Sequence, residues 1–182
     1  MHIIFEGLDR VGKGTQIKML QVDPFFRKDS RVFHTMHYGS LPYTDKKDHI
    51  KHSSELYASM FRLMVMNRES CEFIFDRSHL GESVYAPLYR KYNGDYVFSI
   101  ENKYTKALEN ELYLIVLVSD PSVVISRDDG NSFYKTEQDV QKEIDMFEKA
   151  FKKSSIRKKY MLNVKDFSED IVHTLIMNFL TR

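Results

Sequence analysis

Several features that define whole classes of protein are missing from this sequence. Cys71 is its only cysteine, which excludes an internal disulfide framework and a cysteine-based zinc site. No segment reaches the roughly 18 apolar residues of a membrane span, and no basic stretch near the N-terminus leads into an apolar signal core. We therefore expect a cytoplasmic protein without a membrane partner.

A strong charge of either sign is also missing. The 27 basic and 26 acidic side chains leave a formal net charge of +1, which does not indicate a protein that coats nucleic acid. The basic run KKSSIRKKY at 152–160 is more economically interpreted as a solvated helix end than as a nucleic-acid patch. We expect no nucleic-acid partner, and local charge must meet any anionic ligand.

The apolar residues suffice for one core. With 182 residues, of which 42% are hydrophobic, the chain length favours a single domain over residues 1–182. The run LYLIVLV is apolar at nearly every position, as in a parallel strand that is buried on both faces. Short β-rich runs lie at 2–6, 31–38, 71–76, 112–118 and, more weakly, 159–164.

Segments with helical spacing separate these runs. Apolar residues recur every three or four positions at 56–64, 140–151 and 172–179. Pro121 indicates the first turn of another helix, with Asp120 as its cap. Strands and helices alternate, which predicts an α/β fold: a parallel five-stranded sheet with helices on both faces and ligands at the carboxyl ends of the strands.

The strongest functional signal is the stretch FEGLDRVGKGTQ at residues 5–16. Gly7, Gly12 and Lys13 have the spacing of a phosphate-binding P-loop, directly after a predicted strand and before a predicted helix. The backbone amides of such a loop point at phosphate oxygens, and Lys13 would reach the β- and γ-phosphates of ATP. The residues expected to hold the nucleotide are Gly7, Arg10, Val11, Gly12, Lys13, Gly14, Thr15 and Gln16.

The loop also suggests how Mg²⁺ would be bound. Gly14 stands where a strict P-loop has Ser or Thr, and Thr15 follows one position later, so Thr15 would contact the ion directly or through bridging waters. Asp76 follows the apolar run FIF and would sit at the carboxyl tip of a strand, where a carboxylate can orient magnesium-bound water. Thr15 and Asp76 are the candidate metal ligands.

These motifs are similar to those of the nucleoside monophosphate kinases. FEGLDRVGK resembles the opening of the thymidylate kinases, and GKGTQ is similar to the P-loop ending of adenylate kinases. CEFIFDRSHLGESVYA resembles the thymidylate kinase strand that precedes Asp-Arg-Tyr and a second tyrosine, with Asp76, Arg77 and Tyr85 at the matched positions. Ser78 and Ala86 depart from that pattern, and the segment 37–49 lacks the family's Arg-Glu-Pro-Gly.

The resemblance implies how an acceptor nucleotide would be bound. Asp9 would contact its sugar, Arg77 its phosphate, and Arg62, in the segment LYASMFR, its phosphate or base. Tyr85 and a neighbouring aromatic such as Phe61 would bracket the base. The substrate-binding candidates are Asp9, Tyr38, Phe61, Arg62, Arg77 and Tyr85.

The resembled family has two layouts, with the catalytic arginine either in the P-loop or in a lid. Arg10 assigns this chain to the first layout. The polar segment 127–138, which contains Arg127, would form a short lid over the triphosphate, and the segment 37–49 is a second candidate ligand-closing loop. The catalytic candidates are Arg10, Lys13, Asp76 and Arg127.

The residues and the resemblance together predict a kinase that moves the γ-phosphoryl group of ATP to a deoxynucleoside monophosphate, in the first place dTMP, to give dTDP. Ser78 and the loop at 37–49 leave open a broad or a dGMP- or dAMP-directed kinase, or a deoxynucleoside kinase. A nucleotide-binding regulator is the alternative that is not an enzyme. The resemblance also implies a homodimer, and the short chain and mixed motif are compatible with a viral enzyme in the host cytoplasm.

Overall fold

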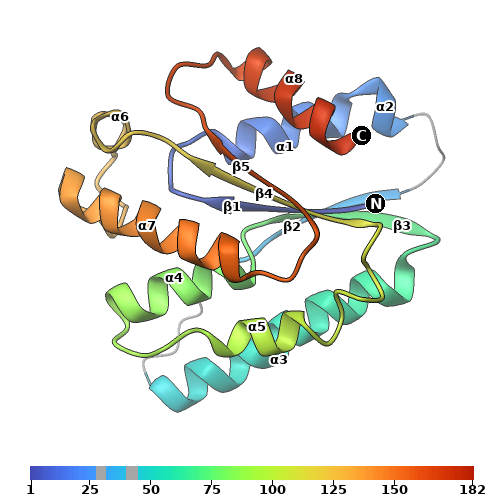
Figure 1. Ribbon diagram of the computed structural model, residues 1–182, viewed down its shortest axis with the longest axis horizontal. Helices are drawn as coiled ribbons and strands as arrows, with labels where there is room; N and C mark the ends of the chain where they lie inside the picture. The colour runs from blue at the N-terminus through green and yellow to red at the C-terminus, as the bar shows by residue number, and fades with distance from the viewer. Residues whose placement is uncertain (28–31, 40–44) are drawn as a thin grey trace.

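The computed structural model describes residues 1–27, 32–39 and 45–182, and its centre is one parallel sheet (Figure 1). The strand order is β2-β3-β1-β4-β5, and every neighbouring pair runs parallel. The strands are β1 (His2–Gly7), β2 (Val32–His37), β3 (Cys71–Asp76), β4 (Leu112–Val118) and β5 (Lys158–Asn163). The predicted five-stranded parallel sheet is confirmed.

Helices cover both faces of the sheet (Figure 1). One layer holds α1 (Lys13–Val22), α2 (Pro24–Arg27) and α8 (Glu169–Leu180). The other holds α3 (Lys46–Asn67), α4 (His79–Tyr89), α5 (Tyr96–Glu101) and α7 (Glu137–Lys153). The short α6 (Pro121–Ser126) lies beyond the carboxyl end of β4. Alternating strands and helices produce these layers because each parallel connection must cross over the sheet.

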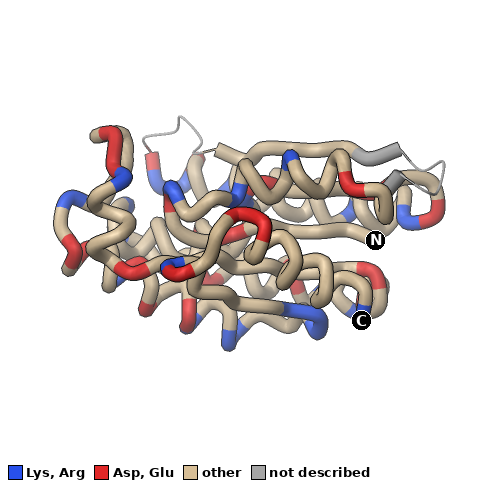
Figure 2. The backbone as a smooth tube through the Cα atoms, turned by 90° about the horizontal axis from the view of Figure 1, so that it is seen from above, with Lys and Arg blue, Asp and Glu red and all other residues tan. Residues whose placement is uncertain are grey.

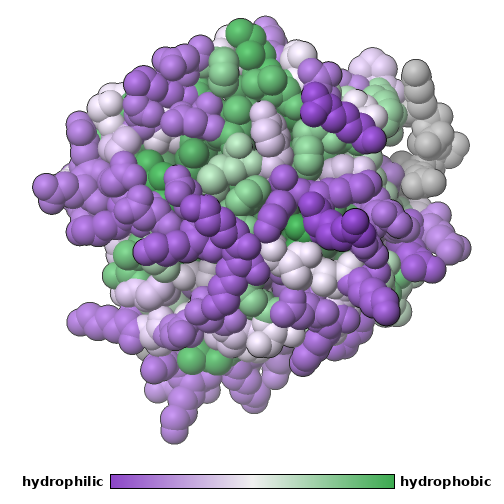
Figure 3. Space-filling view, in the orientation of Figure 1, coloured by the Kyte–Doolittle hydropathy of each residue, from purple (hydrophilic) through white to green (hydrophobic). Residues whose placement is uncertain are grey.

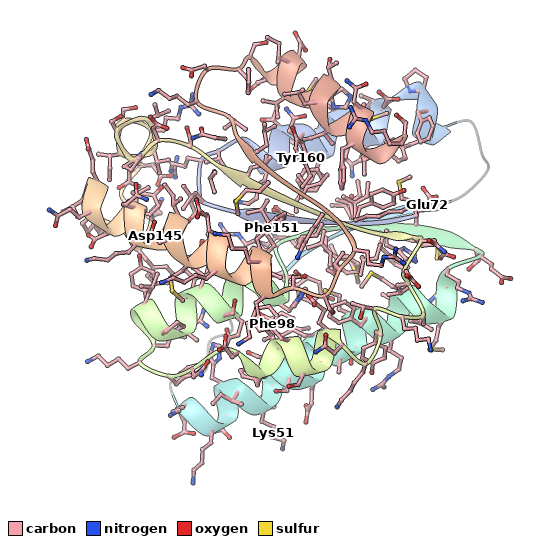
Figure 4. The ribbon with its side chains drawn as sticks, in the orientation of Figure 1. Lys51, Glu72, Phe98, Asp145, Phe151 and Tyr160 are labelled. Atoms are coloured by element: carbon pink, nitrogen blue, oxygen red, sulfur yellow. The ribbon has the colours of Figure 1, made fainter. Side chains whose placement is uncertain are left out.

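The central strands are buried because both of their faces are covered. Every residue of β1 and β4 is buried. The sheet also contacts aromatic side chains of the helices: Tyr160 of β5 lies on the side of α8 (Figure 4), and its ring centroid is 5.3 Å from that of Phe179. Lys51 of α3 is exposed and points away from the sheet. The continuous apolar run of β4 therefore reflects its central position in the sheet.

Several local predictions need correction. Pro121 begins α6, but the Asp120 side chain does not cap that helix; it accepts from Lys165 Nζ at 2.5 Å and Asn163 Nδ2 at 3.1 Å. Helix α3 begins at Lys46, so the end of the predicted loop 37–49 is helical, and residues 40–44 of that loop lie outside the described residues. The partners of Asp120 are Asn163 at the end of β5 and Lys165 just after it, which lie close because β5 runs parallel beside β4.

The surface carries mixed charge. Acidic and basic residues are interspersed along the chain (Figure 2), in keeping with the net charge of +1. On the face shown in Figure 3, hydrophobic residues gather over α8, near whose start Phe167 and Ile171 are exposed. No helix in the described ranges combines the length and hydropathy that a bilayer crossing requires.

The turn out of β1 has a strict steric requirement at Gly7. Its φ is +119°, a conformation that side chains disfavour, and a Cβ atom built there would lie 1.9 Å from the carbonyl oxygen of Leu117 in β4. The same oxygen accepts the amide hydrogen of Leu8 at 3.2 Å. The chain can therefore leave β1 in this direction only because residue 7 has no side chain.

We expect Gly7→Ala to destabilise the fold by about 3 kcal/mol or more, since it combines positive-φ strain with a main-chain clash. Gly14→Ala is the matched control, because a Cβ atom at Gly14 meets nothing within 4 Å and its φ is not in the positive range. Urea unfolding of the two variants measures the difference. Equal stabilities would show that β4 moves aside at no cost.

Candidate functional site

The residues between β1 and α1 form a loop that wraps around a cationic side chain. Gly12 has φ of +87° and directly precedes Lys13, the first residue of α1. Lys13 is buried, and its Nζ donates to the carbonyl oxygens of Gly7 at 3.0 Å and Leu8 at 2.5 Å. The loop amides and the positive end of α1 surround the same space, which suits a phosphate group.

The charge of Lys13 is sensitive to pH. Its pKa is lowered from 10.5 to about 8: burial is the largest cause and the nearby Arg77 guanidinium adds to it, while the carboxylates of Asp9, Asp76 and Glu6 oppose the change. Desolvation dominates because the amine exchanges water for two carbonyl oxygens. An anion placed beside this amine would favour the protonated form.

A first cleft opens along this loop. It is lined by Asp9, Arg10, Gly12, Lys13, Gly14, Thr15, Lys18, His37, Asp76 and Arg77. Its lining combines three lysine or arginine side chains of the loop and helix α1 with the carboxylates at the tips of β1 and β3. The predicted Lys13, Thr15 and Asp76 thus come together at the carboxyl edge of the sheet, as the parallel arrangement requires.

Asp76 has one oxygen available for a ligand. Its Oδ2 lies 2.9 Å from His37 Nδ1, whereas Oδ1 is buried and has no hydrogen-bond partner among the described residues. Thr15 lines the same cleft. A carboxylate oxygen and a hydroxyl fit Mg²⁺, which takes few protein ligands and shares the rest with phosphates and water. The described residues contain no cluster of three or more His, Cys, Asp or Glu side chains that could hold a metal.

A second cavity adjoins the first. Its lining comes from β1, α3, α4, the segments that directly follow β2, β3 and α4, and the segment before α7, and Arg77 belongs to both hollows. The lining residues are Glu6, Tyr38, Gly39, Tyr57, Arg77, Ser78, Gly81, Glu82, Tyr85, Arg90 and Phe133. The lining combines aromatic rings with charged groups, as in a pocket for a flat polar ligand.

An ion pair stands between the two hollows. The Arg77 guanidinium hydrogen-bonds Asp9 Oδ1, and both side chains are partly buried. Arg77 has φ of +70°, and its amide donates to the carbonyl oxygen of Phe5 at 2.8 Å, which ties it to β1. Burial lowers the pKa of Arg77, but the Asp9 carboxylate and its neighbours outweigh that effect and raise it. Asp9 was predicted to contact the acceptor's sugar and Arg77 its phosphate, and in the structure these two side chains are paired with each other.

The far end of the second cavity is a buried carboxylate network. Glu82 Oε1 accepts from the hydroxyls of Tyr92 at 2.5 Å and Tyr96 at 3.0 Å, and Oε2 accepts from Arg90 Nη1 at 2.5 Å. His49 Nδ1 lies 2.8 Å from the same Tyr92 hydroxyl. Both oxygens of Glu82 accept hydrogen bonds from protein groups, so Glu82 fixes the position of Arg90 at the cavity wall.

Helix α7 carries a buried carboxyl group outside the cavity lining, and the pKa of this group lies near neutral pH. Burial raises the pKa of Glu143 to about 7, although the hydroxyl of Tyr89 donates to it at 2.5 Å. The neighbouring Tyr85 hydroxyl is buried without a partner among the described residues, and its ring meets Phe147 edge-on. Of these residues, Tyr85 is the one that lines the cavity.

The predicted lid packs against the P-loop. Arg10 forms an ion pair with Asp129 and lies 3.9 Å from Asp128, while Arg127 Nη1 donates to the carbonyl oxygen of Arg10 at 3.5 Å. Tyr134 is fully buried and anchors the segment in the core. Helix α7 begins at Glu137, so only residues 127–136 of the predicted lid 127–138 are irregular. Arg10 and Arg127 lie next to each other, and Arg10 meets lid carboxylates.

Three predicted contacts do not fit the structure. Gln16 is buried, donates its side-chain amide to the Glu169 carbonyl oxygen at 3.0 Å, and uses its backbone amide in the first turn of α1. Phe61 is fully buried, with its ring stacked on Tyr104 at 5.7 Å, and Arg62 is exposed beside a separate groove between α3 and α5. We therefore remove Gln16, Phe61 and Arg62 from the site.

Other cavity residues were not anticipated from the sequence. These are Glu6, Tyr57, Glu82, Arg90 and Phe133. Tyr57 and Phe61 both lie on the buried face of α3, one helical turn apart, but Tyr57 lines the cavity and Phe61 does not. Glu6 was visible as a lone acidic residue at the end of the first apolar run, a pattern that also marks an ordinary strand end.

The sheet order and the phosphate-binding loop define the α/β fold of the P-loop kinases. No protein-family profile and no curated protein sequence matches the chain. Among solved structures, the YorR protein from Bacillus subtilis, in complex with phosphorylated GDP, superposes with a TM-score of 0.67 at 17% identity, covering 100% of this chain and 96% of that one.

Two further solved structures share the fold. The thymidylate kinase from Candida albicans has a TM-score of 0.58 at 16% identity and covers 99% of this chain and 90% of its own. The deoxyadenosine kinase from M. mycoides, with bound dATP, has a TM-score of 0.58 at 18% identity and covers 100% of both chains. At these identities the likeness establishes the fold, and the chemistry must be argued from the site.

We expect ATP binding to be linked to proton uptake through Lys13. Because its pKa in the free protein is about 8, raising the pH through 8 removes the charge, and affinity above that value should fall by up to about tenfold per pH unit. Calorimetry at pH 8 in buffers of different ionisation enthalpy should register uptake of about half a proton. Lys13→Arg should abolish the uptake, whereas pH-independent affinity between 7.5 and 9 would contradict the assignment.

Proposed function

We propose that this protein is a nucleoside monophosphate kinase that transfers the γ-phosphoryl group of ATP to a deoxynucleoside monophosphate, in the first place dTMP, giving dTDP. The observation that carries the proposal is the pair of adjoining hollows that share Arg77. One is built for phosphates and the other for a flat polar molecule. Such a pair suits in-line transfer between two bound nucleotides.

The donor would lie in the first cleft. Lys13 and the loop amides would bind its β- and γ-phosphates, and Lys13 would exchange its bonds to Gly7 and Leu8 for phosphate oxygens. Thr15 and Asp76 would hold Mg²⁺, which neutralises charge on the terminal phosphates. Gly7 and Gly12 contribute by letting the backbone approach, and Val11 is buried beneath the loop.

The acceptor would lie in the second cavity. An oxygen of its phosphate attacks the γ-phosphorus, the bond from that phosphorus to the bridging oxygen breaks, and ADP leaves with the electron pair. Arg77 would turn part of its guanidinium from Asp9 to the acceptor phosphate, because a dianion competes well for a shared cation. Tyr38, Tyr57 and Tyr85 would enclose the base.

Arg10 would stabilise the transferring phosphate from within the P-loop. In the structure its guanidinium is paired with Asp128 and Asp129 of the lid. Those carboxylates hold the lid on the loop, and the arginine would exchange one of them for the γ-phosphate as charge moves in the transition state. Arg127 would then close over the transferring phosphate.

We also propose that the protein is a homodimer and acts in the cytoplasm.

A deoxynucleoside kinase is the second candidate, and one observation favours it. Both arginines of the second cavity are already paired with carboxylates, Arg77 with Asp9 and Arg90 with Glu82. A neutral nucleoside would leave these pairs intact, whereas a monophosphate must displace at least one. Broad, dGMP-directed and dAMP-directed kinases share the proposed chemistry and differ only in the base.

We expect Arg10→Ala to lower turnover on the order of 10³-fold while changing ATP affinity much less, because the arginine acts mainly in the transition state. Arg127→Ala should cost far less turnover. Steady-state kinetics with ATP and dTMP measure both variants. The reverse order of losses would assign the catalytic cation to the lid.

An acceptor panel tests the proposed reaction. ADP release is followed with ATP and each of the four deoxynucleoside monophosphates, and separately with thymidine. We expect dTMP to be the best acceptor and thymidine to stay at background. Phosphorylation of thymidine but of no monophosphate would favour the second candidate, and ATP binding without any transfer would point to a nucleotide-binding regulator.

A further inference from the structure

Glu6 is a buried carboxylate at the end of β1 that lines the second cavity. Its exposure is 1%. Oε1 accepts three hydrogen bonds, from the amide of Ser78 at 2.8 Å, the hydroxyl of Ser78 at 3.0 Å and the amide of Gly81 at 3.0 Å. Three donors on one oxygen fix the carboxylate in a single orientation.

The other oxygen of Glu6 is left for a ligand. Within the described residues, Oε2 has no hydrogen-bond partner, although a carboxylate oxygen offers two lone pairs. A carboxylate taken out of water is costly unless both of its oxygens are satisfied. Gly81 lies beside this oxygen, since a Cβ atom added at Gly81 would lie 3.4 Å from Oε2. The absence of a side chain there keeps Oε2 open to the cavity.

Glu6 and its partners Ser78 and Gly81 line the same cavity as Arg77, which the cavity shares with the phosphate cleft, and as Glu82, which binds Arg90. A nucleotide with its phosphate at Arg77 and its base toward Arg90 would present its sugar to Oε2. Asp9, the other carboxylate expected to meet the sugar, is occupied by Arg77.

We propose that Glu6 Oε2 accepts the 3′-hydroxyl hydrogen of the acceptor sugar, so that Glu6 selects acceptors that carry this hydroxyl. The inference rests on the proposed function, since it takes the second cavity as the acceptor site. It gives the sugar contact to Glu6 and leaves Asp9 to orient Arg77.

A hydrogen-bond chain behind Glu6 supports its position. Ser78 Oγ lies 3.1 Å from His79 Nδ1, and His79 Nε2 lies 2.6 Å from Glu101 Oε2 in the core. Despite burial, the bonds from His79 and from the serines that follow α7 lower the pKa of Glu101 to about 2, so it is a carboxylate at neutral pH. Ser78 and His79 are positioning residues that connect Glu6 to this fixed anion.

The test compares two ligands on two proteins. Affinities of dTMP and of its 3′-deoxy analogue are measured by calorimetry for the unaltered protein and for Glu6→Gln. In Glu6→Gln the amide oxygen would face the Ser78 and Gly81 donors, so an NH₂ group that cannot accept would face the ligand. The unaltered protein should prefer dTMP roughly 10- to 100-fold, and Glu6→Gln should prefer it less than about threefold.

Gly81→Ala is the second variant, because it leaves Glu6 in place and covers Oε2 with a methyl group. Its helical backbone tolerates alanine, so folding should be retained, while the preference for dTMP should fall as in Glu6→Gln. Ser83→Ala on the same helix and Glu148→Gln on the surface of α7 are controls that should change neither affinity by more than about twofold.

Two outcomes would overturn the inference. If dTMP binds but the protein does not distinguish it from the 3′-deoxy analogue, or if Gly81→Ala keeps the full preference, Oε2 does not contact the sugar, and the proposed function stands. If neither nucleotide binds and the acceptor panel shows no transfer, the inference and the proposed function fail together. ATP affinity should be the same in Glu6→Gln, which separates a local from a general defect.

Discussion

The close approach of the first loop to β4 is the constraint on which the site depends. At Gly7 the chain leaves β1 so close to the carbonyl oxygen of Leu117 that a side chain could not be accommodated. That turn directs the chain back over the end of the sheet, where Gly12 directly precedes α1. Lys13, the first residue of α1, then lies inside the loop. Because β1 is central in a parallel sheet, the loop meets the carboxyl tips of β3 and β4, and the acidic and basic residues on those tips become its neighbours.

Charge pairing inside the protein prepares the site for anions. Arg77 with Asp9, Arg90 with Glu82, and Arg10 with the lid carboxylates all place a cation beside a partner that a phosphate can replace. A buried charge with such a partner avoids the cost of isolation, and an incoming phosphate exchanges one ion pair for another. Lys13 is the exception, because only carbonyl oxygens accept from it, and its lowered pKa follows from that environment.

The fold does not identify the acceptor of the proposed reaction, and the residues that line the second cavity restrict which acceptors it could use. Structures that superpose on this chain include a thymidylate kinase and a deoxyadenosine kinase, so one backbone carries acceptors with and without a phosphate. Here the discriminating features are the aromatic walls, the Glu82 network at the far end and the open oxygen of Glu6. In the proposed reaction these groups would define the sugar and base of the acceptor more closely than they define the presence of its phosphate.

The sequence alone determined the sheet and the phosphate loop, because both are local. Near-continuous apolar runs mark buried parallel strands, and glycines at fixed spacing between a strand and a helix mark the loop. Only the tertiary structure decided the second cavity, whose lining comes from segments far apart in the chain. Phe61 and Arg62 are adjacent in sequence, yet one packs in the core and the other faces solvent, since each helical residue turns the side chain by about 100°. Packing likewise decided that Glu6, at the end of a strand, points one oxygen at Ser78 and leaves the other open.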